Sequence, residues 1–411
     1  MKQLSVRLLG KPIGILSQTD SGTIEYQYEK QAQKPLSISL PIQSDVFSSR
    51  LCRPYFEGLL PESDVVRTLI GKKYGISPHN IFSLLESIGH DCAGAVSFHQ
   101  LDEAVSLENS HVMDGRELNR EELKQLISDL PKRPLFTDVD GLRLSLAGIQ
   151  DKAALCYKNG NFMIPHGLCP TTHIVKTPIP DIEGSILNEY SCLKIAKNIG
   201  LLAPDVEIFN FDGVEFLLIE RYDRHELDGK IIRLHQEDFC QALGILPGSK
   251  YENEGGPSTV KCFNLVENSY FSGKDKLNFL KYFVFNILIG NKDAHGKNYS
   301  FLYNLDQNPS LSPLYDVLCT DMYPSLTKKM AMKIGGKYLL GDVYDRHWKI
   351  FSEDLGISLL QLTKLIFKTG EQIKNQLNNP DFTIEKLHED IWQNFKDHIL
   401  KNIDMILSRL K

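Results

Sequence analysis

Residues 279–300 read Phe-Leu-Lys-Tyr-Phe-Val-Phe-Asn-Ile-Leu-Ile-Gly-Asn-Lys-Asp-Ala-His-Gly-Lys-Asn-Tyr-Ser, an apolar run that ends abruptly in a dense polar cluster. The cluster holds Asp293, His295, Lys297 and Asn298 within a few positions. A helix that is apolar on most of its faces is buried in the core of a protein. We therefore expect a core helix here that delivers polar side chains to a functional cleft.

The spacing of the polar residues indicates phosphoryl transfer. Asp293 and Asn298 stand five positions apart, which is the offset between the catalytic aspartate and the magnesium-binding asparagine of the protein-kinase catalytic loop. A second carboxylate, Asp316, follows in the segment Leu-Ser-Pro-Leu-Tyr-Asp. Magnesium prefers oxygen ligands, so Asn298 and Asp316 are a candidate metal pair. A lone aspartate near a glycine is more often turn chemistry, and the prediction therefore depends on the whole constellation.

The composition is that of an ordinary globular protein. The chain has 411 residues, of which 42% are hydrophobic and 24% charged, enough for about two or three domains. No stretch approaches the roughly eighteen apolar residues of a membrane span, and the N-terminus lacks a signal-peptide core. We therefore expect a cytoplasmic protein. The eight cysteines form no Cys-x-x-Cys pair, which argues against a zinc ribbon or a disulfide scaffold and favours reduced, mostly buried thiols.

The net charge of −6 gives no reason to expect free-standing binding to nucleic acid, which normally needs a basic face. The candidate basic patch consists of Lys328, Lys329, Lys333 and Lys337. A solvated surface is the more common explanation for such a run of charges.

The hydrophobic pattern predicts a strand-rich first half and a helical second half. Residues 3–29 alternate like antiparallel strands, 54–85 are helical, and 101–140 are a polar stretch with one helix near 120–130. Further strands are predicted at 142–146, 152–157, 173–176, 206–211 and 216–220, and a helix at 186–199. Beyond Arg221 the pattern is helical almost throughout. This layout predicts an α+β, bilobal, protein-kinase-like fold with boundaries near residues 140 and 220 and an all-helical C-terminal lobe.

The middle of the chain offers candidate nucleotide contacts. Phosphoryl transfer requires amides and lysines that neutralise phosphate charge. The turn at 147–152 can wrap phosphates and ends in Lys152, and Lys176 ends a short strand. Glu189 on the following helix either pairs with Lys176 or interacts with the helix dipole. Residues 220–222 stand where strand gives way to helix, and we expect their main chain to meet a purine. Tyr222 either stacks on the base or packs in the hinge.

Several segments together resemble the HipA family of serine/threonine toxin kinases. They are residues 144–152, 172–176, 188–190, 219–223, 236–240, 288–298 and 313–316. Segments 37–41, 58–63 and 88–95 extend the resemblance over nearly the whole chain. The resemblance therefore implies that residues 1–140 form an extra subdomain of the HipA N-terminal type, that 141–220 belong to the nucleotide-binding part, and that 221–411 carry the catalytic loop.

The resemblance also implies roles for particular residues. It makes Asp293 the catalytic base and assigns magnesium to Asn298 and Asp316. Ser145 matches the autophosphorylation site, whose modification expels the phosphate loop and silences the kinase. The implied ATP contacts are Ala147, Gly148, Ile149, Gln150, Asp151, Lys152, Lys176, Glu220, Arg221, Tyr222, His295, Gly296, Lys297, Asn298, Tyr315 and Asp316.

Family members are the toxins of type II toxin–antitoxin modules. Each is paired with a small helix-turn-helix antitoxin of the HipB type that represses the operon, so operator DNA is expected to be met only through the antitoxin complex. The best known target is glutamyl-tRNA synthetase, whose phosphorylation starves translation and produces a dormant, drug-tolerant persister cell. The resemblance thus implies ATP and Mg²⁺ as cofactors and an aminoacyl-tRNA synthetase as substrate.

Some features depart from related kinases. The phosphate loop has one glycine rather than a Gly-x-Gly-x-x-Gly set, and Val317 and Leu318 follow Asp316 where eukaryotic kinases have Phe-Gly. Residues 291–292 and Ala294 vary the dipeptides usual in the HipA family, which leaves the protein target open. Two other functions are considered: a small-molecule phosphotransferase of the aminoglycoside or choline kinase type, and a non-catalytic corepressor that clamps an antitoxin on DNA.

Overall fold

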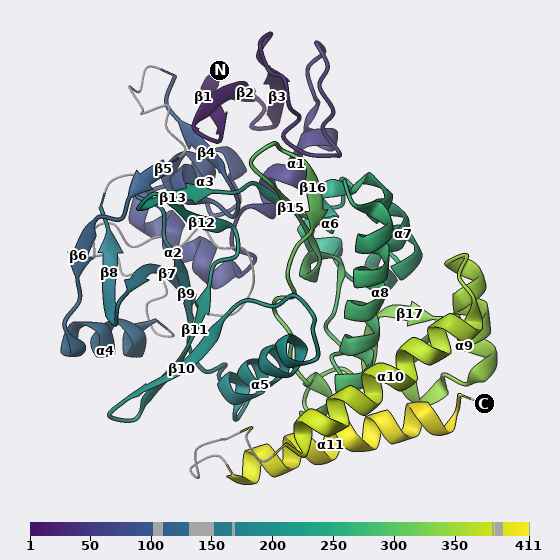
Figure 1. The fold of residues 1–411 in the computed structure, drawn as a ribbon. Coiled ribbons are helices and arrows are strands. Elements are labelled where there is room, and N and C mark those ends of the chain that lie inside the picture. The colour runs from purple at the N-terminus through teal and green to yellow at the C-terminus, as the bar shows by residue number, and fades with distance from the viewer. Residues whose placement is uncertain (102–109, 131–151, 167–168, 380–381, 383–388, 411) are drawn as a thin grey trace. The chain divides into compact units, whose positions relative to one another are not determined.

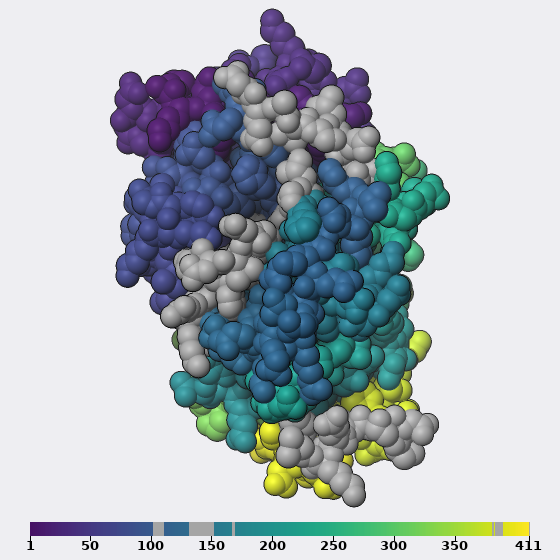
Figure 2. Space-filling model, turned by 90° about the vertical axis from the view of Figure 1, so that its left-hand side faces the viewer, coloured from purple at the N-terminus to yellow at the C-terminus, as the bar shows by residue number. Residues whose placement is uncertain are grey.

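The structure, a computed structural model, describes residues 1–101, 110–130, 152–166, 169–379, 382 and 389–410. The remaining residues are grey in Figure 1 and Figure 2. The chain divides into two compact units. The first unit comprises Met1–Thr177, Phe209–Gly248 and Ser300–Pro309, and the second comprises Pro178–Ile208, Ser249–Tyr299 and Ser310–Lys411. The chain passes between the units several times, and the boundaries expected near residues 140 and 220 stay predictions.

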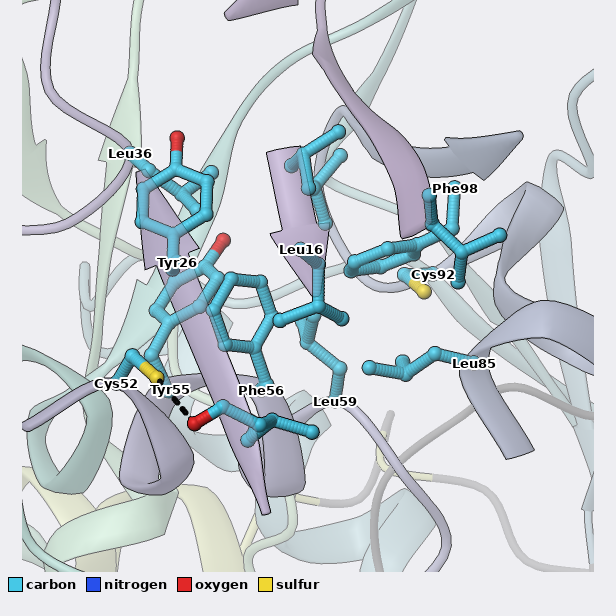
Figure 3. Packing of buried hydrophobic residues seen from close by; sticks show 14 of the residues in the cluster. Leu16, Tyr26, Leu36, Cys52, Tyr55, Phe56, Leu59, Leu85, Cys92 and Phe98 are labelled. Carbon is cyan, nitrogen blue, oxygen red and sulfur yellow. Dashed lines mark hydrogen bonds between the residues drawn. The ribbon is translucent and has the colours of Figure 1, made fainter. Parts of the chain in front are cut away.

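The first unit begins with a four-stranded antiparallel sheet in the order β3-β2-β1-β4. Its strands are β1 (Lys2–Leu8), β2 (Lys11–Gln18), β3 (Ile24–Tyr28) and β4 (Val96–His99), and helices α1 (Ser49–Gly58), α2 (Asp64–Tyr74) and α3 (Ile81–Ile88) lie between β3 and β4 in sequence. Leu16, Tyr26, Phe56 and Phe98 belong to one buried cluster of this region (Figure 3). The alternating pattern at 3–29 is therefore confirmed as strands.

A second sheet has the order β10-β11-β9-β7-β8-β6, and all of it except residues 206–208 belongs to the first unit. It consists of β6 (Gly115–Glu117), β7 (Lys152–Lys158), β8 (Asn161–Pro165), β9 (His173–Lys176), β10 (Val206–Phe211) and β11 (Val214–Glu220), and α4 (Arg120–Asp129) shares its apolar core. Asn159 and Gly160, like Asp212 and Gly213, have positive φ at the two hairpin turns, as two-residue turns of this kind require. These predicted strands are confirmed, whereas the strand expected at 142–146 lies outside the described residues.

The expectation of helix almost throughout beyond Arg221 is wrong for several short segments. They are the strands β12 (Arg224–Leu227), β13 (Lys230–Arg233), β14 (Gln236–Asp238), β15 (Ser300–Tyr303), β16 (Pro309–Leu311), β17 (Lys329–Ile334) and β18 (Lys337–Leu339). Strands β12 and β13 form a small sheet with β5 (Ser110–Val112). Such segments are too short to show a reliable alternation, and β14 is held by β15, a partner far away in the sequence.

Helices nevertheless dominate the second unit. They are α5 (Ser185–Asn198), α7 (Thr259–Leu265), α8 (Ser272–Ile289), α9 (Asp345–Asp354), α10 (Leu359–Leu377) and α11 (Glu389–Ser408), while α6 (Phe239–Ala242) belongs to the first unit. Helices α10 and α11 both pack on α8 and on each other (Figure 1). The apolar helix expected from the sequence is thus confirmed as α8, and it lies at the centre of this unit's helix packing.

A buried ion network follows β11 in the first unit. The Arg221 guanidinium donates two hydrogen bonds to Asp223, at 2.9 and 2.8 Å, and Arg224 contacts both Asp223 at 2.8 Å and Asp91 at 3.0 Å. The Gly94 amide also donates to Asp223, at 2.8 Å. Burial disfavours the Asp223 carboxylate, but Arg221 and Arg224 outweigh burial and hold its pKa below the usual value. The segment 88–95 is therefore a structural brace for the chain that leaves β11.

A buried carboxyl group braces the segment 37–41 in the same unit. Glu237 accepts hydrogen bonds from the Ser37 hydroxyl at 2.5 Å, the Ile38 amide at 3.1 Å and the Tyr303 hydroxyl at 2.5 Å. Its side chain is fully buried, and burial outweighs these bonds and raises the pKa of Glu237 from 4.5 to about 7. The carboxyl group is therefore protonated more readily in the folded chain than in the unfolded chain.

This raised pKa predicts a specific pH dependence of stability. Because the folded chain binds the proton more tightly, the contribution of Glu237 is complete below about pH 4.5 and is lost as the pH rises to about 7. Relative to Glu237→Gln, the free energy of unfolding of the native chain should fall by about 3 kcal/mol over this window. Urea unfolding of both chains at several pH values measures the difference. A difference that stays constant with pH would contradict the assignment.

Candidate active site

Helix α8 carries the polar cluster to the end of a buried element. It ends at Gly290, whose φ of 79° lies in the left-handed region. The Gly290 amide donates a hydrogen bond to the Ile287 carbonyl at 3.2 Å, and the Asn291 amide donates one to the Asn286 carbonyl at 2.9 Å. A Cβ atom on Gly290 would lie 3.0 Å from the Cβ atom of Asp321. Glycine therefore both ends the helix and allows this close approach.

The loop after α8 is held by side chains on both sides. The Asn291 side chain donates to the Asn286 side chain at 2.8 Å and accepts from the Asp293 amide at 3.0 Å. The Thr320 hydroxyl accepts from the Lys292 amide at 2.7 Å. Asn402 of α11 donates to the last carbonyl groups of α8, those of residues 287 and 288. The main chain that carries Asp293 is therefore fixed by the fold of the second unit.

Asn298 and Asp316 meet, as the metal-pair prediction requires. The Asn298 amide nitrogen donates to the Asp316 carboxylate at 3.0 Å. The side-chain oxygen of Asn298 is buried and accepts no hydrogen bond from the described part of the chain. Buried polar atoms normally have a partner, and an amide oxygen beside a carboxylate is the oxygen donor set that Mg²⁺ prefers. The residues present therefore fit a magnesium ion.

The backbone at Asp316 is itself unusual. Its φ is 57°, in the left-handed region. Aspartate and asparagine enter this region more readily than most residues, and such conformations concentrate at functional sites. The Tyr315 hydroxyl donates to the Lys297 carbonyl at 2.6 Å. The segment with Tyr315 and Asp316 is thus attached to the loop with Lys297 and Asn298 at two points.

A tyrosine that the sequence did not single out contacts the proposed base. The Tyr251 hydroxyl donates to Oδ1 of Asp293 at 2.6 Å. Its ring lies edge-on to His295, with centroids 5.2 Å apart. Burial, with the nearby Lys250 and Lys297 cations, lowers the pKa of His295 to about 3 despite the opposing effect of Asp316. His295 is therefore neutral at ordinary pH, and its ring packs against that of Tyr251.

Two predicted phosphate-binding lysines are neighbours in the first unit. Lys152 of β7 and Lys176 of β9 are direct partners in the antiparallel register. Directly opposed residues of antiparallel strands share one face of the sheet, and like charges there repel unless an anion compensates them. Ser145 and residues 147–151 lie outside the described residues. Lys176 and Glu189 belong to different units, so their pairing stays a prediction.

The central residue of the predicted hinge, Arg221, has a buried side chain. The Arg221 side chain is 2% exposed and belongs to the buried ion network. Its amide donates to the Thr172 carbonyl at 2.9 Å. The Arg221 side chain therefore supports the hinge, and the contact of the main chain of residues 220–222 with adenine stays a prediction.

Three further expectations concern the candidate basic patch, the cysteines and membrane spans. Lys328 forms an ion pair with Asp321 at 3.5 Å, and Lys333 forms an ion pair with Glu252 at 3.1 Å. Half of the candidate basic patch thus has an acidic neighbour, which favours the solvated-surface interpretation. All eight cysteines are buried, as expected. Within the described ranges, no helix combines the length and apolar character needed to cross a membrane.

Family models cover both ends of the chain. The HipA-like C-terminal domain matches residues 144–378, and the HipA N-terminal domain matches residues 4–99. The chain belongs to the HipA family. It is 39% identical to the putative kinase Y4mE of Sinorhizobium fredii over 92% of this chain and 93% of that protein. It is 30% identical to the serine/threonine-protein kinase toxin HipA of Shewanella oneidensis over 92% of this chain and 89% of that protein.

A solved HipA structure has the same fold. It comes from the complex of Shewanella oneidensis HipA, HipB and operator DNA. The match has a TM-score of 0.85 at 28% identity and covers 99% of this chain and 98% of that chain. The predicted α+β, protein-kinase-like fold and the resemblance to HipA kinases are therefore confirmed. The chain is a serine/threonine-protein kinase of this toxin family, and its activity implies the use of ATP.

Proposed function

We propose that the chain is a toxin that transfers the γ-phosphoryl group of ATP to a serine or threonine hydroxyl of a protein, with Asp293 as the catalytic base. The observation that carries the proposal is the buried oxygen of Asn298, which accepts no hydrogen bond from any described residue, beside the Asp316 carboxylate. Both groups are attached to the loop that presents Asp293, and this loop is held from several sides. Positioning and charge stabilisation are the main requirements of phosphoryl transfer.

Each residue has a distinct task in this proposal. Asp293 accepts the proton of the attacking hydroxyl. Asn298 and Asp316 hold Mg²⁺, which neutralises charge on the phosphates when bound. Lys152 and Lys176, which lie directly opposite each other on β7 and β9, neutralise further phosphate charge. The loop at 147–151 completes the phosphate contacts, and residues 220–222 meet the adenine.

The protein target and the regulation that we propose are those that the resemblance to the family implies. The proposed substrate is an aminoacyl-tRNA synthetase, and glutamyl-tRNA synthetase is the first candidate. Its phosphorylation would halt translation. Ser145 is the proposed autophosphorylation site, where nearly two added negative charges would repel the nucleotide phosphates. A HipB-type antitoxin is the proposed partner, supported by the likeness to HipA in its complex with HipB and operator DNA. The net charge of −6 agrees with DNA contact made through the antitoxin.

Label transfer tests this function. The purified chain is incubated with radiolabelled ATP and Mg²⁺, with glutamyl-tRNA synthetase, with other synthetases, and with aminoglycosides or choline. Label on a synthetase, and on Ser145 by phosphopeptide mapping, is the expected result. Label on a soluble metabolite would instead establish a small-molecule phosphotransferase. A corepressor without catalysis would leave all acceptors unlabelled and would not arrest growth on expression.

A further inference from the structure

The geometry points to Tyr251 as a positioning residue for the catalytic base, an inference that rests on the function proposed for Asp293. The Tyr251 hydroxyl donates to Oδ1 of Asp293 at 2.6 Å. A hydrogen bond from a neutral donor to an ionised carboxylate is stronger than one between neutral groups. Tyr251 lies 42 positions before Asp293 in the sequence, so the contact is created by the folding of the second unit.

A tight turn holds the main chain of Tyr251. Its carbonyl accepts hydrogen bonds from the Glu254 amide at 3.0 Å and from the Gly256 amide at 2.8 Å. A Cβ atom on Gly256 would lie 2.5 Å from the Ser249 carbonyl oxygen and 2.6 Å from the Lys250 carbonyl group. A side chain at position 256 is thus incompatible with this turn. The segment 249–257 is therefore built to return closely on itself around Tyr251.

The residues on either side of Tyr251 are anchored as well. The Lys250 carbonyl accepts from the Gly296 amide at 3.4 Å. On the other side, the Glu252 carboxylate accepts from the Lys333 amide at 2.8 Å and forms an ion pair with the same lysine at 3.1 Å. One neighbour is thus attached to the catalytic loop and the other to β17. The main chain that carries the Tyr251 phenol is consequently anchored on both sides. Such anchoring is the preorganisation that a catalytic group needs.

The chemistry of a kinase base explains why such a donor is useful. A carboxylate has two oxygens with about four lone-pair sites, so the hydrogen bond from Tyr251 restrains the orientation of the Asp293 carboxylate while it occupies only one of these sites. The same bond favours the ionised form that accepts the proton. Tyr251 forms no covalent bond and moves no proton in this role. It restrains the direction in which the Asp293 carboxylate faces.

Tyr251→Phe tests the inference because it removes the hydroxyl and keeps the ring against His295. The readout is the total turnover of radiolabelled ATP, with the chain itself and water as acceptors, so no protein substrate has to be known. We expect kcat to fall about tenfold to a hundredfold, with KM for ATP unchanged within about twofold. Tyr270→Phe is the matched control, since Tyr270 belongs to the same unit and is 63% exposed. Unchanged kcat in Tyr251→Phe would overturn the inference.

A double-mutant cycle separates positioning from a general structural effect. If Tyr251 acts through Asp293, then Tyr251→Phe combined with Asp293→Asn turns over ATP at the same residual rate as Asp293→Asn alone. Losses that multiply in the double variant would show an independent effect and would overturn the inference. Near-native turnover by Asp293→Asn would overturn the proposed function itself, and the inference with it. Failure of the inference alone is therefore distinguishable from failure of the proposed function.

Discussion

Replacing Asp293 by Asn is expected to lower kcat about a hundredfold to ten-thousandfold while the chain remains folded. Asparagine has nearly the same size, and its Oδ1 can still accept the hydrogen bond that Tyr251 donates. It cannot accept the proton of the attacking hydroxyl, so only the chemical step should be lost. Label transfer from ATP to protein measures the rate, and calorimetry of nucleotide binding reports whether the site is intact.

A control for this experiment is available in the same unit. Asp354 is an exposed aspartate at the end of α9, and Asp354→Asn should transfer phosphate at the native rate. Native-level transfer by Asp293→Asn would remove Asp293 from the mechanism. Loss of nucleotide binding in Asp293→Asn would indicate damage to the site and would contradict a role confined to the chemical step.

Asp316→Asn is expected to remove most of the magnesium-dependent part of ATP binding and to lower kcat about a hundredfold or more. The reason is the loss of the charged oxygen ligand next to Asn298. The φ of 57° at this position is tolerated by asparagine as well as by aspartate, so the main chain should be retained. Calorimetry with ATP, in the presence of Mg²⁺ and then of a chelator, separates the metal-dependent affinity from the rest.

The control for Asp316 shares its backbone conformation. Asp228 has a φ of 51° in the exposed turn between β12 and β13. Asp228→Asn should bind ATP with native affinity in both the Mg²⁺ and the chelator experiments. Equal Mg²⁺-dependent affinity in Asp316→Asn and the native chain would count against the metal role and would leave Asn298 without an explanation for its unpaired oxygen.

Elements with local signals were predictable from the sequence. The β10–β11 hairpin has Asp212 and Gly213 at its turn, and α8 has a long apolar run ended by Gly290. Turn chemistry and hydrophobic periodicity depend on a few adjacent residues, which the sequence displays directly. Strands β14 and β15 were missed because each has only a few residues, and because they pair with each other across more than sixty positions of sequence.

In the candidate site, too, some residues were predictable from the sequence and others were not. Spacing and residue chemistry identified Asp293, Asn298 and Asp316 as candidates, whereas Tyr251 was missed. Its segment shows no catalytic motif, and the only available signal was the glycine pair at 255–256 followed by a proline, which indicates a tight turn. Residues 220–222 were expected to meet the adenine through their main chain, which stays a prediction, whereas no local pattern indicated that the Arg221 side chain would lie in a buried ion network of the first unit.

The sequence by itself determined the kinase-like fold class and the residue types available for phosphoryl transfer, because both depend on patterns along the chain. Only the tertiary structure decided which of these groups meet. The contact between Asn298 and Asp316 requires a left-handed residue at 316, and that between Tyr251 and Asp293 requires the closed turn at 249–257. Hydrogen bonds between distant segments depend on the packing of the whole unit, and no local pattern of residues records them.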